Sequence, residues 1–249
     1  MRSTHTCGVG GVLSADIAVP EHARELRFYA QILTTGKEPL WRDDLMNSRG
    51  TPVIGLGERV PEYESLPLQW MPHIQVADVA ASAARAVELG GVELMHGKDE
   101  DGQSQWAVLV DPGGAAFGVI PVVGEEANVP GNSGTSGSIA WLTLTVSDVS
   151  KTCEFYEQVI GWSGAPNDEG GCEMRRPGGD SVAEICIARG DEEVIPPVWI
   201  LSLPVGDLEE SLRRVRDGGG EVLQESLEPR SAVIRDPVRV SIALQGARD

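Results

Sequence analysis

Hydrophobic and polar residues alternate most clearly in the stretch 139–162, which reads IAWLTLTVSDVSKTCEFYEQVIGW. Positions 142, 144 and 146 are apolar and lie on one side of an extended chain, while positions 141, 143 and 145 lie on the other. Asp148 follows as a helix-capping residue, and apolar residues then recur at helical spacing up to Gly161. The pattern predicts a strand, a cap and an amphipathic helix.

Three weaker copies of this pattern occur elsewhere in the chain. Each starts with a strand-like run, continues with a helical stretch and ends with further strand-like runs. The pair Phe28-Tyr29 recurs 127 positions later, and the V-x-D motif at Val76 and Asp78 recurs 129 positions later. The chain therefore contains an internal duplication and four similar units. The expected helices begin near residues 21, 78, 148 and 207, and the expected strands are 9–19, 40–41, 51–56, 69–76, 92–96, 105–110, 115–123, 139–146, 170–176, 182–188, 198–205, 221–223, 231–234 and 239–244.

One segment interrupts this order of units. Residues 124–138 read GEEANVPGNSGTSGS and have almost no apolar side chains, which is typical of a flexible linker. We therefore expect two domains, 1–123 and 139–249, each built from two of the four units.

Composition excludes several classes of function. The 249 residues carry a formal net charge of −18, which argues against nucleic acid or an anionic membrane as a partner. No signal-peptide pattern and no long apolar run occurs, so a cytoplasmic protein is expected. The four cysteines form no CxxC pair and have no His at zinc-finger spacing, so neither a disulfide framework nor a structural zinc site is indicated.

The arrangement of these units resembles a known superfamily. Four strand–helix–strand–strand–strand units, the FY pair in the odd units, V-x-D before the helices and Asp-Pro turns at 111 and 236 are similar to the vicinal oxygen chelate proteins. These include glyoxalases, bleomycin-resistance proteins and extradiol dioxygenases, and the segment DPGGAAFGV resembles the two-domain glyoxalase-like proteins of bacteria. The resemblance implies an α+β fold of tandem paired βαβββ modules (glyoxalase/bleomycin resistance/dihydroxybiphenyl dioxygenase-like), with a ligand cavity inside each curved sheet.

The resemblance also implies where metal ligands would stand. The family positions are the start of each unit's first strand, seven residues before the capping Asp, and a late strand seven residues after the Asp-Pro Asp. In this sequence they are occupied by Ser14, Met71, Trp141, Ile200, Gly118 and Ala243. None of these is a good ligand for a divalent metal, so no metal and no other cofactor is expected. A site for a divalent metal nevertheless stays possible, because a shifted strand register could bring Asp16 or His73 into it, with Glu184 as a carboxylate partner.

The leading hypothesis is therefore a binding protein for a small apolar or aromatic molecule, which is held in the cup of a sheet without metal. The alternative is a metal-dependent lyase, isomerase or extradiol-type dioxygenase with a non-standard site around His73, and a third reading is a partner-binding module. The partner expected is a small molecule, and monomer and homodimer both stay open. The predicted ligand-binding residues are Ser14, Asp16, Met71, His73, Gln75, Trp141, Thr143 and Ser202.

Overall fold

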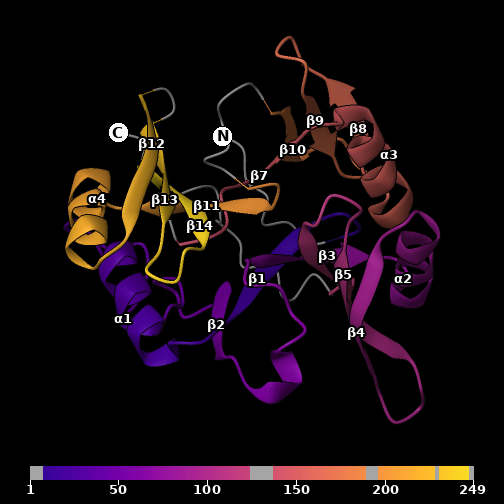
Figure 1. Cartoon of the computed structure of the whole chain (residues 1–249), viewed down its shortest axis with the longest axis horizontal. Coiled ribbons are helices and arrows are strands. Elements are labelled where there is room, and N and C mark those ends of the chain that lie inside the picture. Colours follow the sequence, from indigo (N-terminus) through magenta and orange to yellow (C-terminus); the bar gives the residue numbers. More distant parts are fainter. Residues whose placement is uncertain (1–7, 124–136, 189–195, 228–229, 247–249) are drawn as a thin grey trace.

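The computed structural model of the chain describes residues 8–123, 137–188, 196–227 and 230–246 (Figure 1). Most of the expected linker and Cys7 lie outside these residues, whereas Cys153, Cys172 and Cys186 are free thiols. Within the described residues, no helix is long and apolar enough to cross a membrane.

The first half of the chain forms a six-stranded mixed sheet with strand order β2-β1-β3-β6-β5-β4. The neighbouring strands β1 and β3 are antiparallel and come from different units of the repeat. The elements are β1 (Val12–Val19), α1 (His22–Leu33), β2 (Ile54–Glu58), the short 3-10 helix η1 (Pro61–Tyr63), β3 (Met71–Val76), α2 (Val79–Glu88), β4 (Val92–Lys98), β5 (Ser104–Val110) and β6 (Ala116–Pro121).

The second half forms an eight-stranded mixed sheet with strand order β12-β13-β14-β11-β7-β10-β9-β8. Its elements are β7 (Trp141–Val146), α3 (Val149–Ile160), β8 (Ser163–Pro166), β9 (Cys172–Arg175), β10 (Ser181–Ile187), β11 (Trp199–Val205), α4 (Leu208–Asp217), β12 (Glu221–Leu227), β13 (Arg230–Arg235) and β14 (Ser241–Gly246). The predicted α+β class and the repeated units are confirmed by the order of these elements.

The helices begin where the sequence predicts. Asp78, Asp148 and Asp207 each accept a hydrogen bond from the backbone N–H three residues later, which satisfies a donor that the first helical turn leaves unpaired. Helix α3 ends at Gly161, whose φ of 83° lies in the left-handed region that favours glycine.

The first unit differs in part from the prediction: the strand expected at 40–41 is only an isolated bridge between Trp41 and Asn47, and the strand expected at 51–56 starts later, as β2. The side chain of Asn47 accepts hydrogen bonds from the backbone N–H groups of Arg49 and Thr51, which folds the chain back on itself. Leu45 adopts a φ of 61°, which an extended strand does not allow. Strand β8 was also not predicted, since its four residues, SGAP, carry no hydrophobic alternation.

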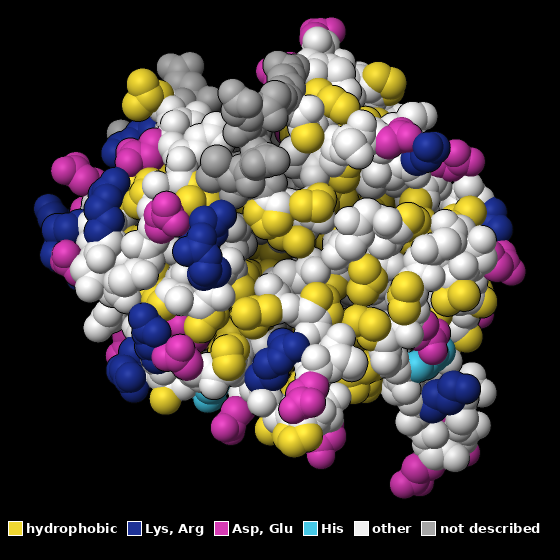
Figure 2. All heavy atoms as spheres, viewed as in Figure 1, with side chains coloured by type: hydrophobic (Ala, Val, Ile, Leu, Met, Phe, Trp, Pro, Cys, Tyr) yellow, Lys and Arg dark blue, Asp and Glu magenta, His cyan; other side chains and the backbone are white. Residues whose placement is uncertain are grey.

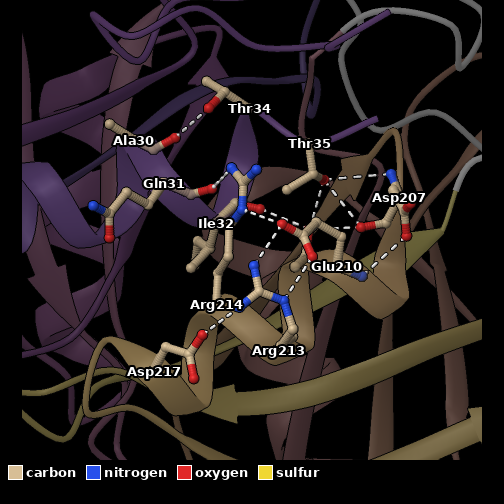
Figure 3. A network of polar contacts seen from close by, with 11 residues as sticks. Ala30, Gln31, Ile32, Thr34, Thr35, Asp207, Glu210, Arg213, Arg214 and Asp217 are labelled. Atoms are coloured by element: carbon tan, nitrogen blue, oxygen red, sulfur yellow. Dashed lines mark hydrogen bonds and ion pairs between the residues drawn. The ribbon is translucent and has the colours of Figure 1, made fainter. Parts of the chain in front are cut away.

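The two halves pack through their helices. Helix α1 contacts α4, and helix α2 contacts α3, so the helix-covered faces of the sheets meet in one hydrophobic core (Figure 1). Polar contacts also link α1 to α4: Arg214 donates to the carbonyl of Gln31 at 2.9 Å, and the hydroxyls of Thr35 and Ser211 lie 2.7 Å apart (Figure 3). The opposite face of each sheet is turned away from these helices.

A buried hydrogen-bond chain also crosses between the halves. The hydroxyl of Tyr29 on α1 donates to the carboxylate of Asp236 in the second half at 2.9 Å and accepts from the indole N–H of Trp70 at 3.1 Å. The duplicated half supplies an equivalent chain around Tyr156. Each tyrosine thus donates a hydrogen bond to an aspartate of the other half, so the two halves make equivalent contacts across their interface.

Charged side chains surround this packed interior. Figure 2 shows acidic and basic groups spread around the rim of one face, while hydrophobic side chains gather over its middle. On this face, charged side chains of both signs are therefore exposed to solvent.

Candidate functional site

The first-sheet cup is the face of that sheet turned away from the helices. Alternation on β3 sends Ile74 and Val76 into the main core, whereas Met71 belongs to a second, smaller apolar cluster on the other side. His73 shares the face of Met71, and Ser14 is its Cα partner across the β1–β3 pair. The polar side chains of the cup thus lie on the neighbouring strands β1 and β3.

Three polar side chains form a chain of contacts in this cup. The Oγ of Ser14 lies 2.9 Å from Nδ1 of His73, and Nε2 of His73 lies 3.4 Å from a carboxylate oxygen of Asp16. The side chain of Asp16 is 56% exposed and that of His73 is 21% exposed. This series of contacts therefore extends from a largely covered imidazole to a carboxylate in contact with solvent. We call Ser14, His73 and Asp16 the polar chain. The sequence placed all three on one face, and the structure brings them into contact.

Burial governs the charge of the histidine. Removal of the imidazole from water lowers the pKa of His73 below its ordinary value, and the nearby carboxylate of Asp16 opposes this change. Because burial is the larger effect, His73 is neutral at neutral pH and has one N–H donor and one nitrogen acceptor.

Two glycines make room for the polar chain. A Cβ added at Gly118 on β6 would lie 2.7 Å from Cδ2 of His73, and a Cβ added at Gly55 on β2 would lie 2.6 Å from Oδ1 of Asp16. Both distances are shorter than real side chains allow, so the imidazole and the carboxylate lie over glycines on the neighbouring strands. In the sequence, Gly118 stands out only as a residue that cannot ligate a metal, and no pattern marks Gly55.

Gly118→Ala is expected to raise the pKa of His73 toward its ordinary value. The new methyl group would displace the imidazole from its covered position and give it more contact with water. NMR titration of the His73 ring protons measures this change. Gly57→Ala is the matched control, because the nearest atom to its Cβ is a backbone oxygen at 3.8 Å. An unchanged pKa in Gly118→Ala would contradict the packing of the ring over Gly118.

The remainder of the first-sheet cup is apolar. Leu66, Met71 and Ala116 are buried in one cluster, and partly buried side chains from β4 and β5 pack against it. The cluster comprises Leu66, Met71, Ala116, Leu94, Met95, Val108 and Val110, which we call the apolar wall. Asp16 and Met71 are Cα partners, so the polar chain and the apolar wall are adjacent. The alternation of residues 105–110 could have located the β5 part of this wall from the sequence.

Gln75 has a different environment from the one predicted for it. Its side chain is fully buried, where its oxygen accepts from the backbone N–H groups of Gly8 and Val123 and its nitrogen donates to the carbonyl of Gly11. These bonds hold the segment that precedes β1 and the end of β6 against β3. Gln75 therefore supports the cup from a covered position, and Met71 contributes only apolar surface to it.

The remaining predicted residues lie on the second sheet. Register places Trp141, Thr143 and Ser202 at the positions that Ser14, Asp16 and His73 hold in the first half, with Ala243 in place of Gly118. The polar chain is therefore absent from the second cup. Its one acidic candidate, Glu184, lies on the interior strand β10 and accepts a hydrogen bond from Asn167 at 2.8 Å.

The donor set of the first-sheet cup does not fit a catalytic divalent metal. Such sites usually offer three protein ligands, whereas this cup provides only the imidazole of His73 and the carboxylate of Asp16. The third family position is Gly118, over which the imidazole lies. Across the described part of the chain, no group of three or more His, Cys, Asp or Glu residues has metal-binding geometry.

Comparison with known proteins identifies related chains. The family model of the glyoxalase-like domain matches residues 14–120 and again residues 141–242. The anthracycline biosynthesis protein DauV of Streptomyces sp. (strain C5) is 29% identical over 183 residues, which cover 71% of this chain but only 65% of DauV. The putative glyoxylase CFP32 of Mycobacterium tuberculosis is 28% identical over 43% of this chain and 45% of its own length.

Solved structures share the fold at low identity. A triple mutant of 4-hydroxymandelate synthase from Streptomyces coelicolor matches 97% of this chain and 94% of its own chain, with a TM-score of 0.55 and 14% identity. A catechol 2,3-dioxygenase matches 96% of this chain and 88% of its own, with a TM-score of 0.53 and 12% identity. At such identities the likeness concerns the fold and not the chemistry.

Proposed function

This chain belongs to the glyoxalase-like domain family, and from that premise we propose that it binds a small apolar or aromatic molecule in the first-sheet cup without a metal ion. The observation that carries the proposal is the meeting of the apolar wall with a short polar chain on one face of the first sheet. Small-molecule sites combine apolar surface with a few polar groups that fix orientation.

Several features favour the first cup over the second. In the first cup, Ser14 and Asp16 remain accessible on β1 and face His73 on β3. In the second cup, an indole stands in place of the Ser14 hydroxyl, and the carboxylate of Glu184 is bonded to Asn167. A ligand that enters the first cup meets both apolar surface and unused hydrogen-bonding capacity.

The names of related proteins are consistent with an aromatic ligand. DauV and DnrV are named as anthracycline biosynthesis proteins, and anthracyclines are fused-ring aromatic compounds. Each match covers 65% of the relative, so the activity and substrates of these longer proteins are carried over here only as a proposal. The apolar wall supports an aromatic ligand, because such a ligand can pack against apolar side chains.

Metal-dependent chemistry is the rival proposal, since dioxygenases have the same fold. It would require a third ligand beside Asp16 and His73, and the described residues offer none at the family position. No catalytic step is therefore assigned to a metal ion in this protein.

A binding screen tests the proposal. We expect fused-ring aromatic compounds to raise the melting temperature of the full chain and to titrate its tryptophan fluorescence, both before and after treatment with a chelator. Val108→Thr, which puts a hydroxyl in the apolar wall, is expected to weaken binding about fivefold, the effect of roughly 1 kcal/mol of unfavourable desolvation.

Val233→Thr is the matched control for this screen. Val233 pairs with Ala243 as Val108 pairs with Gly118, so it holds the equivalent position in the second cup. If Val233→Thr weakened ligand binding and Val108→Thr did not, the binding site would lie on the second sheet. The absence of stabilisation by any aromatic compound, or a near-stoichiometric divalent ion that His73→Ala removes, would overturn the proposal.

A further inference from the structure

We propose that the ligand of the first-sheet cup is an aromatic hydroxyl compound, and that the Oγ of Ser14 accepts the hydrogen bond of its hydroxyl group. This inference rests on the proposed function and specifies the ligand class. It follows from the positions of Asp16 and Ser14 beside the two ring nitrogens of His73, which leave the cup with a hydrogen-bond acceptor.

Asp16 determines which nitrogen of His73 carries the proton. The carboxylate of Asp16 has only acceptor capacity, and it lies 3.4 Å from Nε2 of His73. A neutral imidazole has one N–H, so an N–H on Nε2 would face the carboxylate and leave Nδ1 as an acceptor. The opposite tautomer would direct a lone pair of Nε2 at the negative carboxylate, which is unfavourable.

The tautomer in turn orients the hydroxyl of Ser14. Its Oγ lies 2.9 Å from Nδ1, and a nitrogen without a proton can only accept, so Ser14 must donate its one proton to His73. Within the described residues, the Oγ has no other hydrogen-bond partner. The serine oxygen therefore has its lone pairs left for a ligand, and a lone pair selects a donor such as a hydroxyl group.

The imidazole is poorly placed to bind the ligand itself. Both of its nitrogens face protein groups, and its ring lies over Gly118 with most of the side chain covered. His73 is accordingly a positioning residue, and Ser14 is the residue that contacts the ligand. Ser14 is half-buried on β1, so part of this residue is exposed.

The apolar wall is the reason for assigning an aromatic ring to the ligand. It starts at Met71, the Cα partner of Asp16, and continues across β6 and β5 to β4. A flat apolar ring system can cover this wall while one edge reaches Ser14. The second cup has no equivalent arrangement, because Trp141 takes the position of Ser14 and Ser202 that of His73.

A matched pair of ligands tests the inference. The probes are 2-naphthol and 2-methoxynaphthalene, which share a ring system but differ in the hydroxyl proton. We expect 2-naphthol to bind about tenfold more tightly, the effect of one net hydrogen bond. Ser14→Ala should abolish this preference by weakening 2-naphthol alone. Ser202→Ala, which removes a hydroxyl from the second cup, should leave the affinity for both probes unchanged.

The possible outcomes separate this inference from the proposed function. Equal binding of both probes to the native chain, or a preference that survives in Ser14→Ala, would overturn the assignment of Ser14 while leaving aromatic binding intact. Binding of neither probe would overturn both. Loss of the preference in Ser202→Ala would place the hydroxyl site in the second cup and overturn the inference.

The tautomer gives a second test that needs no ligand. In the full chain labelled with nitrogen-15, ring nitrogen chemical shifts report which nitrogen of His73 is protonated at neutral pH. We expect the proton on Nε2 and an unprotonated Nδ1. A proton on Nδ1 would make Ser14 a donor to the cup and would overturn the inference even if aromatic compounds bind.

Discussion

Asp111→Ala is expected to lower the free energy of unfolding by about 3 to 5 kcal/mol, because it leaves several buried donors unpaired. Asp111 is 5% exposed, and its carboxylate accepts from the backbone N–H groups of Gly113 and Ala115 and from the hydroxyl of Tyr156. The Tyr156 hydroxyl in turn accepts from the indole N–H of Trp199 at 2.8 Å. The substitution therefore breaks both the tight turn before β6 and one of the two buried tyrosine–aspartate hydrogen bonds between the halves.

Chemical denaturation at neutral pH measures this loss, and two variants control for its cause. Asp111→Asn keeps an oxygen for the turn and should lose less. Tyr156→Phe keeps the turn but leaves the Trp199 N–H unpaired, and is expected to cost about 1 to 3 kcal/mol. The double variant should lose less than the sum of the two single variants, because the residues share a hydrogen bond. A loss of under about 1 kcal/mol for Asp111→Ala would contradict the structural role of this link.

A second large effect is expected from Glu25, whose ionisation should make the protein less stable as the pH rises. Glu25 is fully buried in the first turn of α1, and neither of its carboxyl oxygens has a hydrogen-bond partner within the described residues. Its pKa is raised from 4.5 to about 7, mainly by burial and also by the nearby carboxyls of Asp236 and Glu21, while Arg24 opposes the rise. The folded protein therefore binds the Glu25 proton more tightly than the unfolded chain.

The direction of the pH effect follows from this difference in pKa. The stabilisation is complete below about pH 4.5, where both states are protonated, and is lost as the pH rises to about 7. The loss that Glu25 contributes amounts to about 3 kcal/mol at most, from the size of the pKa difference. Urea unfolding between pH 5 and 8 should show a native chain that weakens with rising pH relative to Glu25→Gln.

Glu209→Gln provides the matched control, since Glu209 lies in the first turn of α4 but is exposed. This variant should follow the pH dependence of the native chain. Identical pH profiles of the native chain and Glu25→Gln would show that Glu25 is not protonated in the folded state. The internal repeat adds a comparison, because Thr152 on α3 holds the position equivalent to Glu25 and bonds the carbonyl of Asp148 instead.

The candidate site could be predicted in part. Alternation put Ser14 and Asp16 on one face of β1 and His73 on the same face of β3, because side chains of a strand alternate strictly. It also placed Gln75 on that face. It could not show that the side-chain amide of Gln75 would form hydrogen bonds with backbone groups of Gly8, Gly11 and Val123. The contacts of a long polar side chain depend on segments that arrive from elsewhere in the chain.

The sequence by itself determined the α+β fold, the four helices, three of them capped by an aspartate, and the duplication, since strand alternation, N-capping aspartates and repeated motifs are local properties of the chain. Only the tertiary structure decided that His73 lies over Gly118 between Ser14 and Asp16, and that Glu25 is buried beside Asp236. These contacts join residues far apart in the sequence. Their geometry depends on strand register and on the packing of one half against the other, which no local pattern specifies.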